Sequence, residues 1–194
     1  MGKLNVQGET PTGDEVATPE QELRASPKSI VEALLFASDR PITIQKLGEI
    51  SGIDGKEVRG YVEELNREYE EQGRSYRIEE IAGGFQILTL PEFSEWVGAL
   101  TRSQVESRLS KAALETLAIV AYKQPVLRAE VDAIRGVQSG QIIRTLMEKG
   151  LVKITGRKEV PGRPMLYGTT RKFLEAFGLR SVGDLPKAEE FVQP

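Results

Sequence analysis

The sequence contains neither cysteine nor histidine. Without cysteine it can form no disulfide and no thiolate metal site. Without histidine it lacks the side chain that most often acts as a general base near neutral pH, and Ser-His and Cys-His nucleophile pairs are excluded. We therefore expect no catalytic residue, no bound cofactor and no metal site. A carboxylate-dependent enzyme, with two acids in one cleft, remains an alternative of another class.

Long apolar runs are also absent. No stretch approaches the roughly 20 consecutive apolar residues that a membrane helix needs. The N-terminus has no apolar run preceded by basic residues, so it predicts no secretory signal. These absences, together with the missing cysteine, favour a cytoplasmic protein that does not contact a membrane.

Charge is distributed unevenly, although the net charge is only −3. Residues 1–109 contain 12 basic and 20 acidic residues, whereas residues 110–180 contain 13 basic and 6 acidic residues. An acidic first part and a basic second part are typical of two modules with different partners.

The first part begins with a polar stretch, residues 1–27, that has too few apolar residues to offset the entropy of ordering it. Helical periodicity follows, with a stripe of Ile30, Leu34 and Ala37 in the first helix. The pattern then changes to strand-like alternation. The predicted elements are a helix over 27–39, a short helix between Thr43 and Gly52, a longer helix from Asp54 to about Gln72, a hairpin turning at Gly83-Gly84 and a short helix over 93–100.

The second part repeats this order. Its first helix has Leu114, Leu117, Ala118 and Ala121 on one face. Gly162 is predicted to adopt a positive φ in the loop between its strands. The predicted elements are a helix from Ser110 to Tyr122, a short helix over 128–135, a third helix over 139–149, strands over 151–155 and 165–169 and a closing helix over 171–177.

The repeat holds residue by residue, because one constant spacing relates six pairs: Pro41 and Pro125, Leu47 and Val131, Ile50 and Ile134, Ile53 and Val137, Val58 and Ile142, Val62 and Leu146. Three helices followed by a hairpin is the winged helix-turn-helix order. We predict an α+β, mainly α protein of two tandem winged helix-turn-helix domains. The expected boundaries are a disordered tail over 1–27, a first domain over 28–100, a connector over 101–109, a second domain over 110–180 and a tail over 181–194.

The third helices of the two copies differ in charge. The first carries six glutamates and two arginines over residues 57–71, which would repel a phosphate backbone. It is either a solvated face or a docking face for a protein. The second, with the basic loop over 156–164, has residue types that could contact DNA, although a solvated turn or a protein contact are the alternatives.

The second copy resembles the ScpB family, the kleisin-associated subunits of bacterial SMC condensin complexes. The resemblance rests on Ala112–Pro125 (AALETLAIVAYKQP), Ile142–Gly156 and Gly162–Thr170 (GRPMLYGTT), and it continues through Phe173–Leu179 and Leu185-Pro186. The first copy matches more loosely, at Ile30–Phe36 and Gly83–Phe85. The resemblance covers residues 28–186, and the N-terminal stretch departs from the pattern.

The resemblance implies a non-catalytic accessory subunit in chromosome condensation and segregation, located at the nucleoid. It implies a homodimer formed mainly through the first domain. It also implies that the second domain is prominent in binding the kleisin ScpA, which links the subunit to the SMC ATPase and leaves DNA contact indirect or weak. The apolar candidates for the dimer contact are Tyr61, Leu65, Ile81, Phe85 and Ile87, and those for the kleisin contact are Tyr122, Val126, Leu127, Val160, Met165 and Tyr167. Each of these residues can equally belong to a core.

A DNA-binding transcriptional regulator that uses the basic second domain is the alternative function. Salt-dependent binding to duplex DNA by the isolated protein would favour that alternative.

Overall fold

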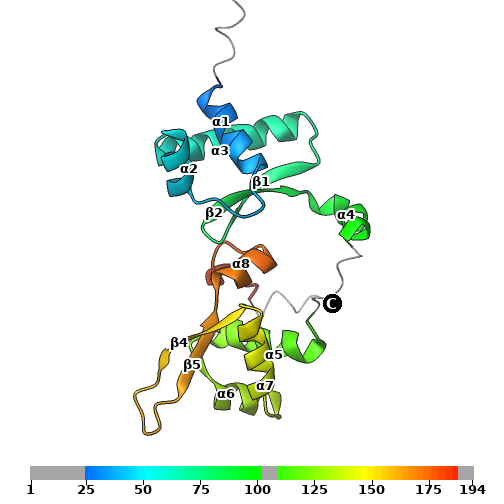
Figure 1. Cartoon of the computed structure of the whole chain (residues 1–194). Coiled ribbons are helices and arrows are strands. Elements are labelled where there is room, and N and C mark those ends of the chain that lie inside the picture. Colours follow the sequence, from blue (N-terminus) through cyan, green and yellow to red (C-terminus); the bar gives the residue numbers. More distant parts are fainter. Residues whose placement is uncertain (1–24, 102–108, 188–194) are drawn as a thin grey trace, which may run out of the picture.

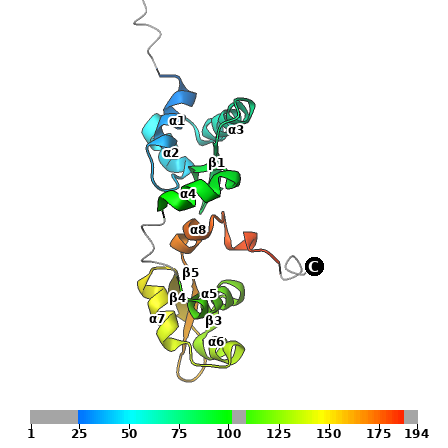
Figure 2. The same cartoon turned by 90° about the vertical axis from the view of Figure 1, so that its right-hand side faces the viewer.

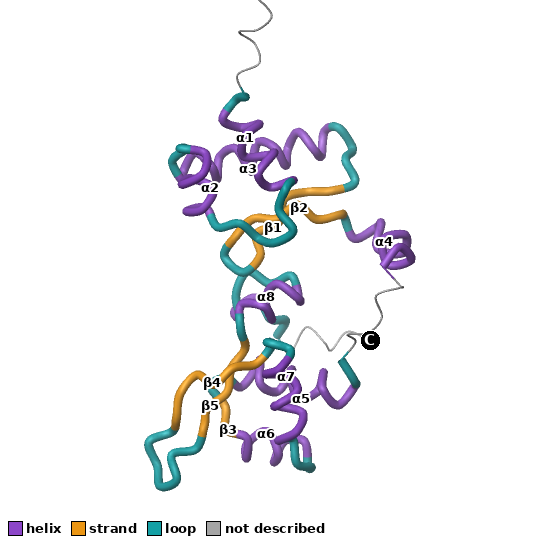
Figure 3. Tube along the Cα trace, viewed as in Figure 1, coloured by secondary structure: helices purple, strands orange, loops and turns teal. Residues whose placement is uncertain are grey.

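The computed structural model describes residues 25–101 and 109–187. Figure 1 shows two lobes joined end to end, and Figure 3 shows that helices dominate both. Each lobe has a small antiparallel sheet of its own, so the predicted α+β, mainly α class is confirmed. The order of elements agrees with the winged-helix expectation, which, like the domain boundaries, stays a prediction. The stretch over 1–24 and most of the predicted connector lie outside the described residues.

The first lobe (residues 25–101) begins each of its three main helices at a capping residue. The side chains of Ser26, Thr43 and Asp54 accept hydrogen bonds from backbone N–H groups of the first helical turn. Its elements are α1 (Pro27–Phe36), α2 (Ile44–Ser51), α3 (Gly55–Glu71), β1 (Tyr76–Ile81), β2 (Gly84–Thr89), the 3-10 helix η2 (Pro91–Phe93) and α4 (Ser94–Thr101).

The core of the first lobe lies between α1, α2, α3 and the hairpin. Val31 and Leu35 are the buried residues of α1, whereas Ile30 and Leu34 of the predicted stripe are half-buried. The stripe therefore lies one position further along the helix than predicted. The core comprises Val31, Leu35, Leu47, Val58, Val62, Leu65, Tyr69, Ile78 and Phe85.

The hairpin of this lobe turns one residue earlier than predicted. Ala82 and Gly83 occupy the turn with φ values of 50° and 74°, and Gly84 is the first residue of β2. Gly84 is needed because the backbone of Ile42 lies against it: an added Cβ would be 2.8 Å from the Ile42 carbonyl carbon and oxygen. Ile42 and Phe85 exchange two backbone hydrogen bonds at this point, which joins the loop after α1 to the sheet.

The second lobe (residues 109–187) has the predicted elements and one additional strand. Its sheet has the order β3-β5-β4, with an irregularity between Ile154 and Gly156. Gly162 has a φ of 85°, as predicted. The elements are α5 (Lys111–Lys123), β3 (Val126–Leu127), α6 (Arg128–Arg135), α7 (Gly140–Glu148), β4 (Val152–Arg157), β5 (Met165–Thr169), α8 (Arg171–Phe177) and the 3-10 helix η4 (Val182–Asp184).

A separate core holds the second lobe together. Val131 and Leu146 are fully buried there, as their repeat partners Leu47 and Val62 are buried in the first lobe. Leu179 and Leu185 pack against this core from beyond α8, so Leu185, which lies in the predicted tail over 181–194, contributes to it. The buried residues are Ala113, Leu117, Val120, Ala121, Val126, Val131, Ile143, Leu146, Leu151, Val152 and Phe173.

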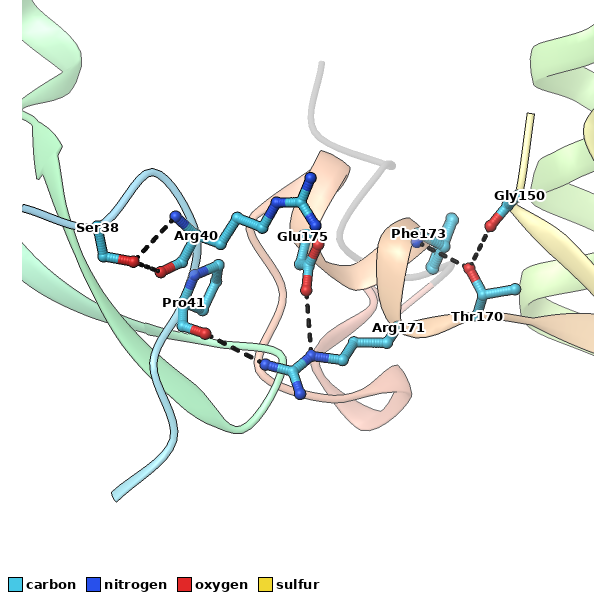
Figure 4. Close-up of polar contacts among 8 residues, drawn as sticks. All are labelled: Ser38, Arg40, Pro41, Gly150, Thr170, Arg171, Phe173 and Glu175. Atoms are coloured by element: carbon cyan, nitrogen blue, oxygen red, sulfur yellow. Dashed lines mark hydrogen bonds and ion pairs between the residues drawn. The ribbon is translucent and has the colours of Figure 1, made fainter. Parts of the chain in front are cut away.

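The two lobes meet where α8 approaches the β1–β2 hairpin of the first lobe. Figure 2 shows α8 below α4 at this junction. The N–H of Ala82, at the hairpin turn, donates to the carbonyl of Leu179 over 2.9 Å. Figure 4 shows the Arg171 guanidinium between its own helix and the first lobe: it donates to Pro41 O (3.3 Å) and to Glu175 Oε1 (3.1 Å). Thr170, which caps α8, donates to Gly150 O over 2.6 Å and so anchors the helix to the second lobe.

Candidate protein-interaction surfaces

The residues predicted for the dimer contact divide into core and surface. Leu65, Ile81 and Phe85 are buried, with exposed fractions of 2 to 4%. Tyr61 on α3 and Ile87 on β2 are half-buried and reach the surface of the first lobe. The buried three support the hairpin and α3 from inside, and the interface role of the whole set stays a prediction.

Ile87 lies beside a surface cavity of about 320 Å³ in the first lobe. Phe36, at the end of α1, also lines the cavity and is 80% exposed. Tyr69 also lines the cavity. Its phenol donates to Glu32 Oε1 over 2.7 Å, and its ring packs edge to face on that of Tyr76. Burial, and then this hydrogen bond, raises the pKa of the Tyr69 phenol, which therefore stays protonated.

A second apolar surface lies on α4, whose residues are not among the candidates for the dimer contact. Trp96 is 67% exposed and Leu100 is 82% exposed, with Val97 beside them. In Figure 1, α4 extends away from α1, α2 and α3. The helix packs on η2, where the rings of Phe93 and Trp96 approach to 6.5 Å. The sequence predicts a short helix here, over 93–100, but periodicity does not say whether a helix packs on its own chain or on another.

Four of the six residues predicted for the kleisin contact come together on β3 and β5. Val126 pairs with Tyr167, and Leu127 pairs with Leu166, next to Met165. Val126 is buried, whereas Leu127, Met165 and Tyr167 are half-buried. Val160, at the tip of the β4–β5 hairpin, and Tyr122, near the end of α5, are separate from this group and 41% and 47% exposed.

Tyr122 belongs to an exposed apolar stripe along α5. Leu114, Ala118 and Tyr122 recur at a spacing of four residues, all three are exposed, and Leu114 is 45% exposed. The predicted face of α5 had combined Leu114 and Ala118 with Leu117 and Ala121, but only the last two are buried. The Tyr122 hydroxyl donates to Pro186 O over 2.7 Å and holds residue 186 beside the C-terminal end of α5.

The face of the second lobe between α6, α7 and β5 has a cavity of about 780 Å³. Its polar walls come from Arg128 on α6, from Gln138 ahead of α7, and from Gln141, Arg144 and Glu148 on α7, and Tyr167 and Met147 add apolar surface. Asp132 and Ser139 fix the junction between the two helices. The Ser139 hydroxyl and N–H both donate to Asp132 Oδ1, and these bonds hold the pKa of that carboxyl below its ordinary value.

The exposed face of α3 is acidic, and two cations near it, Lys28 and Arg59, are paired within the lobe. Lys28 forms ion pairs with Glu68 and Glu64, and Arg59 with Glu80, and these glutamates raise the pKa values of both cations. Within residues 25–101 and 109–187, no three His, Cys, Asp or Glu residues converge on a position that could hold a metal ion. The part of the chain that the structure describes also includes no helix long and apolar enough to cross a bilayer.

Comparison with known proteins identifies the family to which the chain belongs. A sequence model described as "Segregation and condensation complex subunit ScpB" matches residues 29–188. The segregation and condensation protein B of Syntrophotalea carbinolica is 50% identical over 166 residues, which cover 86% of this chain and 84% of the relative. That of Symbiobacterium thermophilum is 48% identical over 163 residues, which cover 84% of this chain and 74% of the relative.

Among solved structures, a conserved hypothetical protein from Chlorobium tepidum is 43% identical. The match covers 82% of this chain and 99% of that protein, with a TM-score of 0.40. The match of the family model over most of the sequence, together with relatives near 50% identity, decides the assignment. The chain belongs to the ScpB family of segregation and condensation complex subunits.

Proposed function

We propose that this chain is a non-catalytic subunit of a chromosome segregation and condensation complex, acting as a homodimer that binds the kleisin ScpA. The match of the ScpB family over residues 29–188 carries the proposal. As the resemblance of the sequence implies, the kleisin connects the subunit to the SMC ATPase at the nucleoid in the cytoplasm. The absence of histidine and cysteine supports a role in assembly rather than in chemistry.

The dimer contact is assigned to the first lobe, and α4 contributes its centre. Large exposed apolar side chains on a short helix are typical of protein interfaces, where aromatic residues supply much of the binding energy. Burying Trp96 and Leu100 against a second copy would contribute about 2–3 kcal/mol for each side chain. Tyr61 and Ile87, which reach the surface of the same lobe, remain candidates for its periphery.

The kleisin contact is assigned to the second lobe, along the α5 stripe (Leu114, Ala118 and Tyr122). The stripe is long enough for about two turns of an amphipathic helix, so it suits the helix-in-groove mode of recognition. The Tyr122 hydroxyl is already bonded to Pro186, which fixes the ring on the surface before a partner binds. The predicted group on β3 and β5, with Val160, remains a second candidate contact for an extended part of the kleisin.

Copurification tests the proposal directly. The full chain is expressed without a tag, together with a tagged central fragment of ScpA, and the eluate is analysed for both proteins. We expect the two to copurify and the complex to persist through size-exclusion chromatography, because apolar contacts do not weaken at moderate salt. A fragment of a tagged, unrelated protein serves as the control. Failure of the chain to elute with ScpA at any salt concentration would remove the kleisin from the account.

A further inference from the structure

The second lobe has a polar, basic surface outside the contacts proposed for α4 and for the α5 stripe. It consists of Arg128 on α6, Gln138, Gln141 and Arg144 at α7, and Arg157 on the β4–β5 hairpin, and it is called the α7–hairpin surface below. It differs from the α5 stripe, because α5 and α7 pack against each other through their buried residues and expose different residues.

The register of the sheet brings Arg157 of the hairpin to the same surface as the cavity. Arg157 pairs with Met165, and Met165 and Tyr167 lie two residues apart on β5, so their side chains share one face of the sheet. Tyr167 lines the cavity together with Arg128 and Arg144. The irregularity after Ile154 is what moves Arg157 onto this face. Figure 1 shows the hairpin extending beyond the helices of the second lobe.

The hairpin tip is held by its own hydrogen bonds. Lys158 N–H donates to Pro164 O, Arg163 N–H donates to Val160 O, and the Arg157 guanidinium donates to Arg163 O over 3.1 Å. A loop ordered in this way loses little entropy when it binds a partner. The Arg157 guanidinium is therefore held in a defined position on the hairpin.

Two of these three cations have no acidic partner. Among the described residues, Arg144 and Arg157 form no ion pair within 4.0 Å, and the Arg157 guanidinium donates to a backbone carbonyl, whereas Arg128 pairs with Asp132 at 3.7 Å. The acids nearby are largely satisfied: Asp132 also accepts two bonds from Ser139, and Glu159 pairs with Arg163. Glu148 is the one acid that lines the cavity. The α3 face of the first lobe is the reverse, with an excess of glutamates and with Lys28 and Arg59 paired.

We propose that the α7–hairpin surface binds the phosphate backbone of duplex DNA without sequence preference. Arginine and lysine side chains neutralise phosphates, and glutamine side chains donate to phosphate or base edges. The helix α7, the third helix of the lobe, would contact one groove of the duplex. The projecting β4–β5 hairpin would contact the backbone at a second point. The inference goes beyond the proposed function, because neither dimerisation nor kleisin binding requires it.

Fluorescence anisotropy of the full chain with a labelled duplex tests the inference. If Arg128, Arg144 and Arg157 each neutralise one phosphate, log K falls with log salt at a slope of about −2.7, so the affinity falls about 40-fold between roughly 50 and 200 mM salt. The double variant R144A/R157A should reduce the slope to about −0.9. The control K56A/R67A removes two exposed cations from α3, neither of which forms an ion pair among the described residues, and should leave the slope unchanged.

Three results would overturn the inference. The first is an absence of duplex binding near 50 mM salt at protein concentrations of about 100 μM, the weakest binding expected for a non-specific protein. The second is an equal loss in both double variants, which would mean that overall charge acts rather than this surface. The third is binding of a labelled polyglutamate peptide that is sensitive to R144A/R157A while the duplex does not bind, which would assign the surface to an acidic protein.

Discussion

Gly84 illustrates how a single residue constrains the first lobe. A Cβ at this position would lie 2.8 Å from backbone atoms of Ile42, which cannot move without breaking the two hydrogen bonds between Ile42 and Phe85. Gly84→Ala should therefore destabilise the protein by about 1–3 kcal/mol, the range for overpacking a well-packed site. Urea denaturation measures the change.

Gly60 provides the matched control for Gly84. It lies on the exposed face of α3, where an added Cβ meets nothing within 4 Å. Gly60→Ala should stabilise the protein by about 0.5–1 kcal/mol, because alanine loses less backbone entropy in a helix. If the two substitutions changed the stability by the same amount and with the same sign, the close approach of Ile42 would not be what requires glycine at position 84.

Asp132 makes the stability of the second lobe depend on pH. Hydrogen bonds from Ser139 lower its pKa in the folded state, and Arg128 and Arg135 act in the same direction. The carboxylate therefore contributes stability that is present above its unfolded pKa of about 3.9 and is lost as the pH falls through the lower, folded value. Asp132→Asn should be less stable than the wild type at pH 6, and the difference between their denaturation midpoints should shrink as the pH falls below about 3.9. A difference that is constant over this range would rule out the charge as the cause.

At the scale of elements, α4 is the main candidate for association between copies. Trp96→Glu combined with Leu100→Glu should convert the dimer to a monomer, because a charge would be buried in an apolar contact. Light scattering measures the mass. Ile50→Glu is the control: Ile50 is also in the first lobe and is 53% exposed, but it lies on α2. A variant at Trp96 and Leu100 that remains dimeric would place the contact elsewhere in the lobe.

The α5 stripe gives a second prediction at this scale. Leu114→Arg should weaken ScpA binding about 30-fold, corresponding to about 2 kcal/mol for one buried apolar side chain. Isothermal titration calorimetry with the kleisin fragment measures the change. Ile134→Arg on α6, where Ile134 is 54% exposed, should have no such effect. Comparable losses of ScpA affinity in both variants would show that the kleisin contact does not depend specifically on α5.

Elements with strong local signals could be predicted from the sequence. The caps Thr43 and Asp54 and the glycines that end helices act through adjacent backbone groups, so residue type alone indicates them. Strand β3 has only two residues, and its formation depends on β5, about 40 residues away in the sequence. The exposed and buried faces of α5 could not be separated, because apolar residues cover more than one side of that helix.

At the scale of the whole molecule, two hydrogen bonds among the described residues connect the lobes through α8 and Leu179. The Ala82 amide should be protected from hydrogen exchange, because it donates to Leu179 O in the other lobe. Arg171→Ala removes the bond to Pro41 and should speed Ala82 exchange about five-fold, corresponding to about 1 kcal/mol for a half-exposed guanidinium. The Phe85 amide, bonded to Ile42 within the first lobe, serves as the internal control. Unchanged exchange at Ala82 would mean that Arg171 does not hold the lobes together.

The central claim is that this chain is a dimeric, kleisin-binding subunit, and the native mass tests that claim most directly. Light scattering coupled to size-exclusion chromatography gives the mass of the free chain and of its mixture with the central ScpA fragment. The account predicts a free species of twice 21.5 kDa and a heavier species that contains both proteins. A free species of 21.5 kDa whose mass is unchanged by the kleisin fragment would contradict it.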